Sequence, residues 1–81
     1  MSTVNIPEAD SVSYREFQEG NPVQVRAVAS PGQEREFEKG KQISISHQNM
    51  KATAVIVSDP IEITNQSESG RKVFSLIVEK T

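Results

Sequence analysis

The choice of apolar residues constrains the fold of this chain more than any other feature of its sequence. Sixteen residues are valine or isoleucine, and Leu76 is the only leucine. Side chains branched at Cβ fit the pleated surface of a sheet and lose rotamer freedom in a helix. A helical bundle of this length would need Leu and Ala on repeating faces. The sequence therefore predicts an all-β fold.

The length of the chain, 81 residues, corresponds to a single domain. Such a domain buries only about 60% of the surface that its unfolded chain exposes, and many small domains add disulfides, metals or partner subunits. With no cysteine and one histidine, the chain has no disulfide, no thiolate-bound zinc and no His-rich metal site. We therefore expect no cofactor and no metal, and association with another subunit as the remaining device.

Five strands are predicted from alternating apolar residues bounded by glycine, proline and polar clusters. They cover residues 23–26, 43–46, 50–58, 61–63 and 71–80. Short turns between them predict a small five-stranded barrel or a curled antiparallel sheet. Pro60 has no amide hydrogen and marks a break, bulge or edge, and residues 65–70 are expected to form a polar loop.

The N-terminal residues differ in character from the rest. Residues 1–13 are polar with scattered apolar positions, and we expect a flexible arm there, in which Pro7 suits the first turn of a short helix. Residues 14–81 then form the single β domain.

A short sequence echo precedes two of the strands. Residues 15–20 read REFQEG and residues 35–40 read REFEKG, and each copy is followed by alternating apolar residues. Both copies predict a phenylalanine anchor, a turn in which Gly20 or Gly40 takes a positive φ, and then a strand. The echo arises either from a duplicated half-barrel or from two turns that use the same local solution.

Two segments are apolar on both faces of the predicted sheet. An antiparallel sheet with one face in water is expected to alternate apolar and polar residues. The two segments are residues 54–57 and 74–78. Either these strands are central and covered on both sides, or their second face is an interface. We expect a homodimer formed through four side chains. These are Val55, Val57, Val73 and Ile77.

Catalytic chemistry has little support in the sequence. His47 is the only imidazole, it lies in a polar segment, and no cysteine or nucleophile-elbow serine accompanies it. We expect a solvated histidine and a protein that is not an enzyme. A small hydrolase that uses His47, Glu36 or Asp59 is the third and weakest alternative. The glutamates beside the predicted turns lack EF-hand spacing, and we interpret them as solubilising charges.

Nucleic-acid binding through a broad basic face is disfavoured by the net charge of −2, although a local patch is compatible with it. The candidate phosphate contacts are four basic residues, which in this alternative converge at one end of a barrel. They are Arg26, Lys41, Lys51 and Arg71. Base stacking needs exposed aromatic side chains. The three phenylalanines are better used in the core, which leaves Tyr14 for this role.

The strand order resembles a known family of small barrels. Residues 23–26 (VQVR), a polar loop, the F-x-x-G-x-x-I segment from Phe37 to Ile43, and the strands at 52–57 and 73–78 are similar to the ASCH/PUA-like β-barrels. This resemblance covers residues 17–78 and implies RNA or modified-nucleoside binding, with Arg26 as the one motif residue that carries over. Gln24 stands where the family has an acid, and residues 21–22 stand where it has a lysine.

Together these observations predict a small non-enzymatic interaction module. It would bind a protein partner, or itself, through an apolar sheet face or a strand edge. An RNA-binding barrel of the PUA/ASCH type is the alternative. The sequence has no apolar run that could span a membrane and no signal peptide at residues 1–5, so we expect no membrane partner and a cytoplasmic location.

Overall fold

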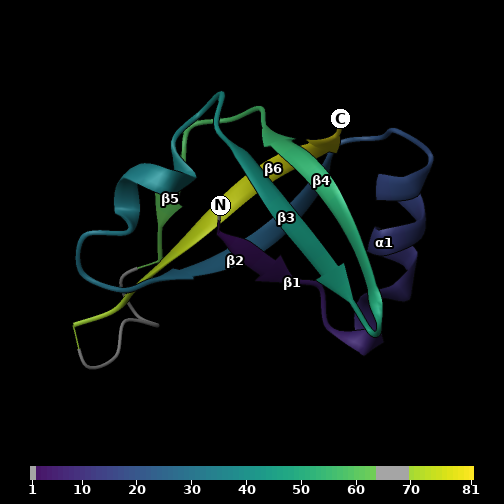
Figure 1. Ribbon diagram of the computed structural model, residues 1–81, viewed down its shortest axis with the longest axis horizontal. Coiled ribbons are helices and arrows are strands. Elements are labelled where there is room, and N and C mark those ends of the chain that lie inside the picture. Colours follow the sequence, from purple (N-terminus) through teal and green to yellow (C-terminus); the bar gives the residue numbers. More distant parts are fainter. Residues whose placement is uncertain (1, 64–69) are drawn as a thin grey trace.

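One strongly curved sheet organises the chain in a computed structural model that describes residues 2–63 and 70–81 (Figure 1). Its strands are β1 (Thr3–Asn5), β2 (Val23–Ala29), β3 (Gln42–His47), β4 (Met50–Ile56), β5 (Ile61–Glu62) and β6 (Lys72–Lys80). Three short helices join them: η1 (Glu8–Asp10), α1 (Ser11–Gln18) and η2 (Glu34–Phe37). The five predicted strands correspond to β2 to β6, and residues 65–69 of the predicted loop lie outside the described residues.

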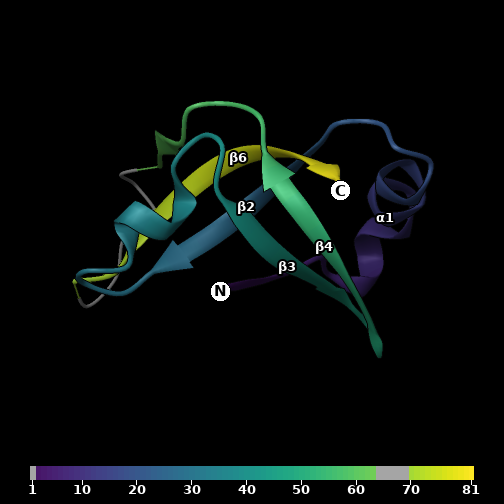
Figure 2. The ribbon, with the colours of Figure 1, turned by 45° about the horizontal axis from the view of Figure 1, so that its top comes forward.

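The strands follow the order β1-β3-β4-β6-β2, and β5 also pairs with β6. The pairing of β1 with β3 is parallel, and the other ladders are antiparallel. The sheet curls until its two terminal strands, β1 and β2, lie near each other without pairing (Figures 1 and 2). This nearly closed sheet confirms the predicted small β-barrel. We call the gap between β1 and β2 the seam.

Pro60 interrupts the strand that runs along one edge of β6. The amide of Val57 donates to the carbonyl of Ile77, and the amide of Ile77 donates to Ser58 Oγ at 3.0 Å. The chain then leaves β6 over residues 58–60 and returns as β5, where Ile61 lies opposite Ser75. A proline cannot donate to a ladder, so the predicted break at Pro60 is confirmed.

The core fills the inner face of the curled sheet because the strands alternate. In β2 the residues are buried and exposed in strict turn, and the buried Val23 and Val25 lie opposite the buried Val78 and Leu76 of β6. The largest side chains with almost no exposed surface come from α1, β3, β4 and β6. They are Phe17, Ile43, Ile45, Ile56, Leu76 and Val78.

The predicted N-terminal arm is wrong over residues 3–13, which belong to the fold. Thr3–Asn5 pair with β3 as strand β1, and Val4 and Ile6 are buried in the core. Pro7 precedes η1, which leads directly into α1. The physical reason is that Val4 and Ile6 alternate with polar residues, as in a strand with one buried face, so this segment forms an additional strand of the sheet.

The two copies of the sequence echo take closely related local structures. Phe17 lies in the last turn of α1, Phe37 ends η2, and both rings are buried. Gly20 and Gly40 each have a φ of 91° and lead into β2 and β3. Each copy is therefore a helical turn, a buried ring and a left-handed glycine. This confirms the predicted turn chemistry and is compatible with either origin of the echo.

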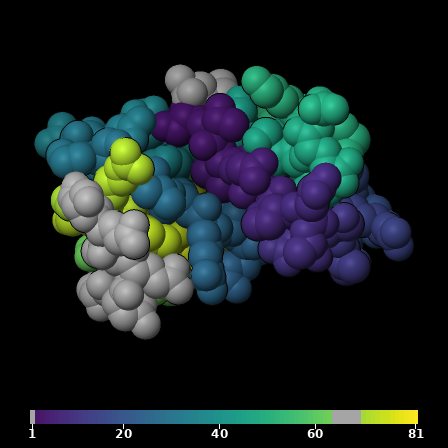
Figure 3. Space-filling model, turned by 90° about the horizontal axis from the view of Figure 1, so that it is seen from below, coloured from purple at the N-terminus to yellow at the C-terminus, as the bar shows by residue number. Residues whose placement is uncertain are grey.

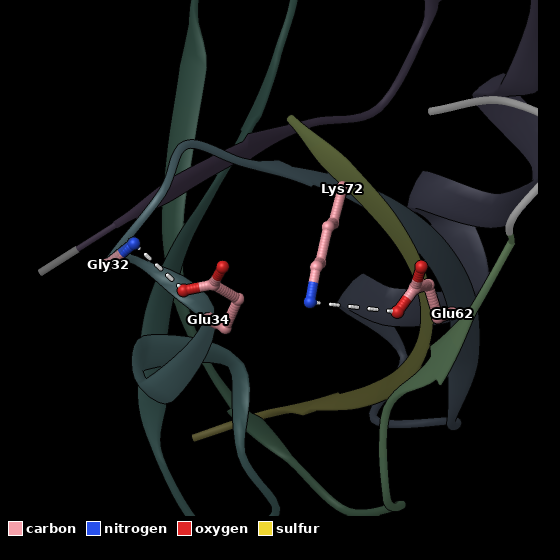
Figure 4. Close-up of polar contacts among 4 residues, drawn as sticks. All are labelled: Gly32, Glu34, Glu62 and Lys72. Carbon is pink, nitrogen blue, oxygen red and sulfur yellow. Dashed lines mark hydrogen bonds and ion pairs between the residues drawn. The ribbon is translucent and has the colours of Figure 1, made fainter. Parts of the chain in front are cut away.

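Two exposed polar contacts lie at the end of the barrel where β2 ends and β6 begins (Figure 4). The carboxylate of Glu34 accepts a hydrogen bond from the Gly32 amide at 2.9 Å, and Lys72 Nζ lies 4.0 Å from Glu62 Oε1 across the β5–β6 ladder. Both pairs are exposed, so they contribute little to stability. They give two of the acidic side chains a local structural role.

Candidate interaction surfaces

The four residues predicted to form an interface lie on one face of the sheet. Val73 and Ile77 have the same parity in β6, Val55 pairs with Glu79, and Val57 continues the β4–β6 ladder beside Ile77. Ala54, Ile56, Leu76 and Val78, which alternate with Val55, Val57 and Ile77, are buried in the core, and Val73 lies opposite the exposed Val28. All four side chains are therefore directed to the outer face of the barrel.

The four residues differ in how much of their surface is exposed. Ile77 is 40% exposed and Val73 only 8% exposed, while Val55 and Val57 are half-buried. Two further apolar side chains of the same face are more exposed: Val28 at 55%, opposite Val73, and Ile61 at 67%, opposite Ser75. We call the surface made by Val28, Val57, Ile61, Val73 and Ile77 the outer apolar surface.

A groove of about 490 Å³ lies at the seam. Its walls are residues 5–7 at the end of β1, Asp10 and Ser13 from η1 and α1, and residues 24–26 of β2. Figure 3 shows the N-terminal segment and α1, in purple, next to β2, in blue, on one face of the molecule. The sequence pattern did not suggest this groove, because it depends on the parallel pairing of β1 with β3.

The hydrogen-bonding pattern of β2 shows which main-chain groups face the seam groove. The amide and carbonyl of Ile77 are directed away from β2, toward Ser58 and Val57. Gln24 is the partner of Ile77 in the β2–β6 register. Opposite residues of an antiparallel ladder alternate between bonded and non-bonded pairs, so the amide and carbonyl of Gln24 are directed away from β6 and toward the seam.

The same reasoning applies to β1. Ser2 accepts from the Ser44 amide, and Ile6 donates to the Ser46 carbonyl at 2.7 Å, so the even-numbered residues of this segment bond to β3. Asn5 therefore turns its amide and carbonyl toward the seam. Among residues 2–63 and 70–81, no backbone hydrogen bond crosses from β1 to β2. Two strand edges face the same groove.

The structure does not gather the four basic residues proposed as nucleic-acid contacts. Lys41 precedes β3, whereas Lys51 pairs with Ser46 near the opposite end of the β3–β4 hairpin. Arg26 lies within β2 opposite Ser75, and Arg71 lies just before β6. The expected convergence at one barrel end is therefore wrong for Lys41 and Lys51, because they stand at opposite ends of one hairpin.

His47 is not the solvated histidine that was expected. It is the last residue of β3, shares the inward parity of Ile43 and Ile45, and is only 2% exposed. Its Nδ1 lies 2.9 Å from the Ile6 carbonyl, and its ring stacks on Tyr14. Tyr14 is buried as well, so it is not an exposed platform for base stacking.

Other kinds of site have no geometric support in the described part of the chain. No group of three or more His, Cys, Asp or Glu side chains in residues 2–63 and 70–81 has an arrangement that could hold a metal ion. His47, Glu36 and Asp59 do not line the seam groove. Within the same residues, no helix is long and apolar enough to cross a bilayer.

Comparisons with known proteins give no independent assignment: no family model, curated protein or solved structure matches this chain. The ASCH/PUA-like resemblance stays a prediction. The outer apolar surface and the seam groove are therefore interpreted from their own geometry.

Proposed function

We propose that this protein is a non-enzymatic interaction module that binds a protein partner through the outer apolar surface, with a second copy of the chain as the first partner to test. The observation that carries the proposal is the exposure of Ile77, Ile61 and Val28 on neighbouring strands of one face. The core is already filled from the opposite face of the same strands. Ser75 and Arg26 lie between Ile77 and Val28 in the register, so the apolar side chains surround a small polar centre. Clustered exposed apolar side chains are typical of protein interfaces.

Two features of this face favour a protein partner. Strands β2, β6 and β5 place these side chains on a continuous sheet, which offers a rigid surface that needs little ordering on binding. The second is that a domain of this size has a limited core, so burial of these exposed side chains in an interface would add to its stability. Burial of one isoleucine side chain contributes about 1.5–3 kcal/mol.

The experiment compares self-association of the wild-type chain with that of two lysine variants. Ile77→Lys places a charge on the outer apolar surface, beside Val57. Val12→Lys places the same charge on α1, where Val12 is equally a surface residue and lies outside this surface. Sedimentation velocity at high micromolar concentration is expected to show a dimer for the wild type and for Val12→Lys, and a monomer for Ile77→Lys.

Heterologous partners are tested with the same pair of variants as bait. Proteins and nucleic acids retained from a native lysate are expected to include a protein that Val12→Lys retains and Ile77→Lys loses. A wild-type chain that stays monomeric, and whose retained molecules are unaffected by Ile77→Lys, would contradict the proposal. Retention of RNA alone, lost in high salt, would instead favour the RNA-binding alternative.

A further inference from the structure

We propose that two copies of the chain pack their outer apolar surfaces face to face about a two-fold axis that follows the row Val57, Ile77 and Gln24. Arg26 of each copy then pairs with Glu79 of the other copy. This inference rests on the proposed function, to which it adds the arrangement of the two copies and the charged residues that fix it. The register of β2, β4, β5 and β6 and the carboxylate of Glu79 carry it.

The register places the outward side chains in rows that run across the strands. The middle row contains Val57, Ile77 and Gln24, since Ile77 pairs with Gln24 of β2 and its carbonyl accepts from the Val57 amide. The row on one side of it contains Val55 and Glu79, which are partners in the β4–β6 ladder. Each row therefore holds side chains from neighbouring strands of the same face.

The row on the other side of the middle row contains Ile61, Ser75 and Arg26, because Ser75 pairs with Ile61 of β5 and with Arg26 of β2. A two-fold axis along the middle row turns this row of one copy onto the row of Val55 and Glu79 in the other. Ile61 then faces Val55, since β4 and β5 pair with the same edge of β6. Arg26 lies one strand away from Glu79, an offset of about 4.8 Å that its long side chain can span.

Glu79 is the residue that gains most from such a pairing. Its side chain is half-buried beside Val55, and it makes no ion pair or hydrogen bond with any residue in 2–63 or 70–81. Burial of a carboxylate is costly unless an opposite charge or a donor compensates it. Arg26 is exposed, and its guanidinium has five N–H donors, enough for contacts within its own chain and for a carboxylate of the second copy.

Self-complementarity is the reason to assign this surface to a second copy. A two-fold interface uses the same patch on both subunits, so a residue and its partner must both lie on that patch, on opposite sides of the axis. Arg26 and Glu79 meet this condition on either side of the middle row. Ile77 lies on the axis and meets Ile77 of the second copy. The polar centre of the surface is thus where the carboxylate of the second copy arrives.

Charge reversal tests this arrangement by sedimentation velocity at high micromolar concentration. Arg26→Glu and Glu79→Arg each place two like-charged pairs in the dimer, and each is expected to weaken self-association at least about tenfold. An equimolar mixture of the two variants is expected to restore a dimer, because both pairs are of opposite charge in the mixed dimer. This rescue requires that the two residues meet across the interface.

The matched control reverses two exposed charges outside this surface, Glu8→Arg in η1 and Arg15→Glu in α1, and both variants are expected to dimerise as the wild type does. Glu79→Gln keeps the shape of the side chain and is expected to weaken self-association several-fold, which keeps the test valid if a reversal disturbs the fold.

Two results would overturn the inference, and each is distinguishable from a failure of the proposed function. If both reversals stay dimeric, or their mixture stays monomeric, while Ile77→Lys still abolishes the wild-type dimer, the axis is wrong and the proposed function stands. A wild-type chain that is monomeric also overturns the inference, and the lysate experiment then decides the proposed function separately.

Discussion

Tyr14 and His47 stack with their ring centroids 4.6 Å apart and their planes 21° from parallel. His47 Nδ1 lies 2.9 Å from the Ile6 carbonyl, which can only accept, so this nitrogen carries the hydrogen. The Tyr14 hydroxyl in turn accepts from Gln18 Nε2 at 2.6 Å. One buried imidazole thus joins the N-terminal segment, α1 and β3, and the first two of these elements line the seam groove.

Removal of this imidazole is expected to destabilise the fold. His47→Leu loses both the ring stack and the hydrogen bond, and we expect the free energy of unfolding to fall by about 2 kcal/mol. His47→Phe keeps a stacked ring and should lose about half as much. Urea unfolding followed by circular dichroism measures both, with the exposed Val12→Ala as a control. Equal stability of His47→Leu and wild type would show that the contact is not important for folding.

The contrast between His47 and the strands shows what the sequence could and could not predict. Alternation of apolar residues in 23–26 and 43–46 is a local property, and it predicted both strands and their buried faces. Burial of His47 depends on which partners face it, Tyr14 from α1 and Ile6 from the N-terminal segment. Neither contact has a local signature, so polar neighbours suggested a solvated residue.

The seam groove could not be predicted for a related reason. It exists because β1 pairs in parallel with β3, about 40 residues away along the chain, and so ends beside β2. Only the alternation of Val4 and Ile6 hinted at a strand. The outer apolar surface was predictable in part: the parity of Ile77 and Val73 followed from the pattern, but the covering of Val73 and the contribution of Ile61 did not.

Gly20 and Gly40 are expected to respond alike to substitution. Each has a φ of 91°, and a Cβ added at either would meet nothing within 4 Å, so the cost of alanine is conformational and not steric. We expect Gly20→Ala and Gly40→Ala each to lower the free energy of unfolding by about 1–2 kcal/mol. The asparagine variants should lose less, because asparagine tolerates positive φ. A markedly different cost at the two positions in urea unfolding would argue against equivalent turns.

Substitutions of Val73 and Ile77 are expected to change different properties, the stability of the monomer for Val73 and self-association for Ile77. Val73 is already buried within one chain, so Val73→Ala should lower the free energy of unfolding of the monomer by about 1–2 kcal/mol. Ile77 is exposed, and Ile77→Ala should change monomer stability by less than about 0.5 kcal/mol while it weakens self-association. Unfolding at low concentration and sedimentation at high concentration report the two effects. If Val73→Ala weakened only self-association and Ile77→Ala lowered the stability of the monomer, the outer apolar surface would not be the interface.

The hydroxyl of Ser58 is expected to protect the Ile77 amide of β6 from hydrogen exchange. Its hydroxyl oxygen accepts from the Ile77 amide at 3.0 Å where the chain departs from the ladder before Pro60. Ser58→Ala leaves this donor without its partner, at a cost of about 1 kcal/mol. Amide hydrogen exchange should show faster exchange at Ile77 in Ser58→Ala, with Val78 as the internal control. Unchanged exchange at Ile77 would mean that another group or water replaces the serine.

The strand edge at the seam can be tested without any ligand, by comparing Gln24 with Val25. The Gln24 amide faces the seam, whereas the Val25 amide, one residue on, faces β6 and bonds within the ladder. Native-state hydrogen exchange should therefore be fast at Gln24 and slow at Val25, by at least about tenfold, because only the second amide must wait for an opening of the sheet. The same contrast is expected between Asn5 and Ile6, since the Ile6 amide donates to the Ser46 carbonyl. Equal protection of Gln24 and Val25 would mean that the Gln24 amide is bonded across the seam and that the seam is closed.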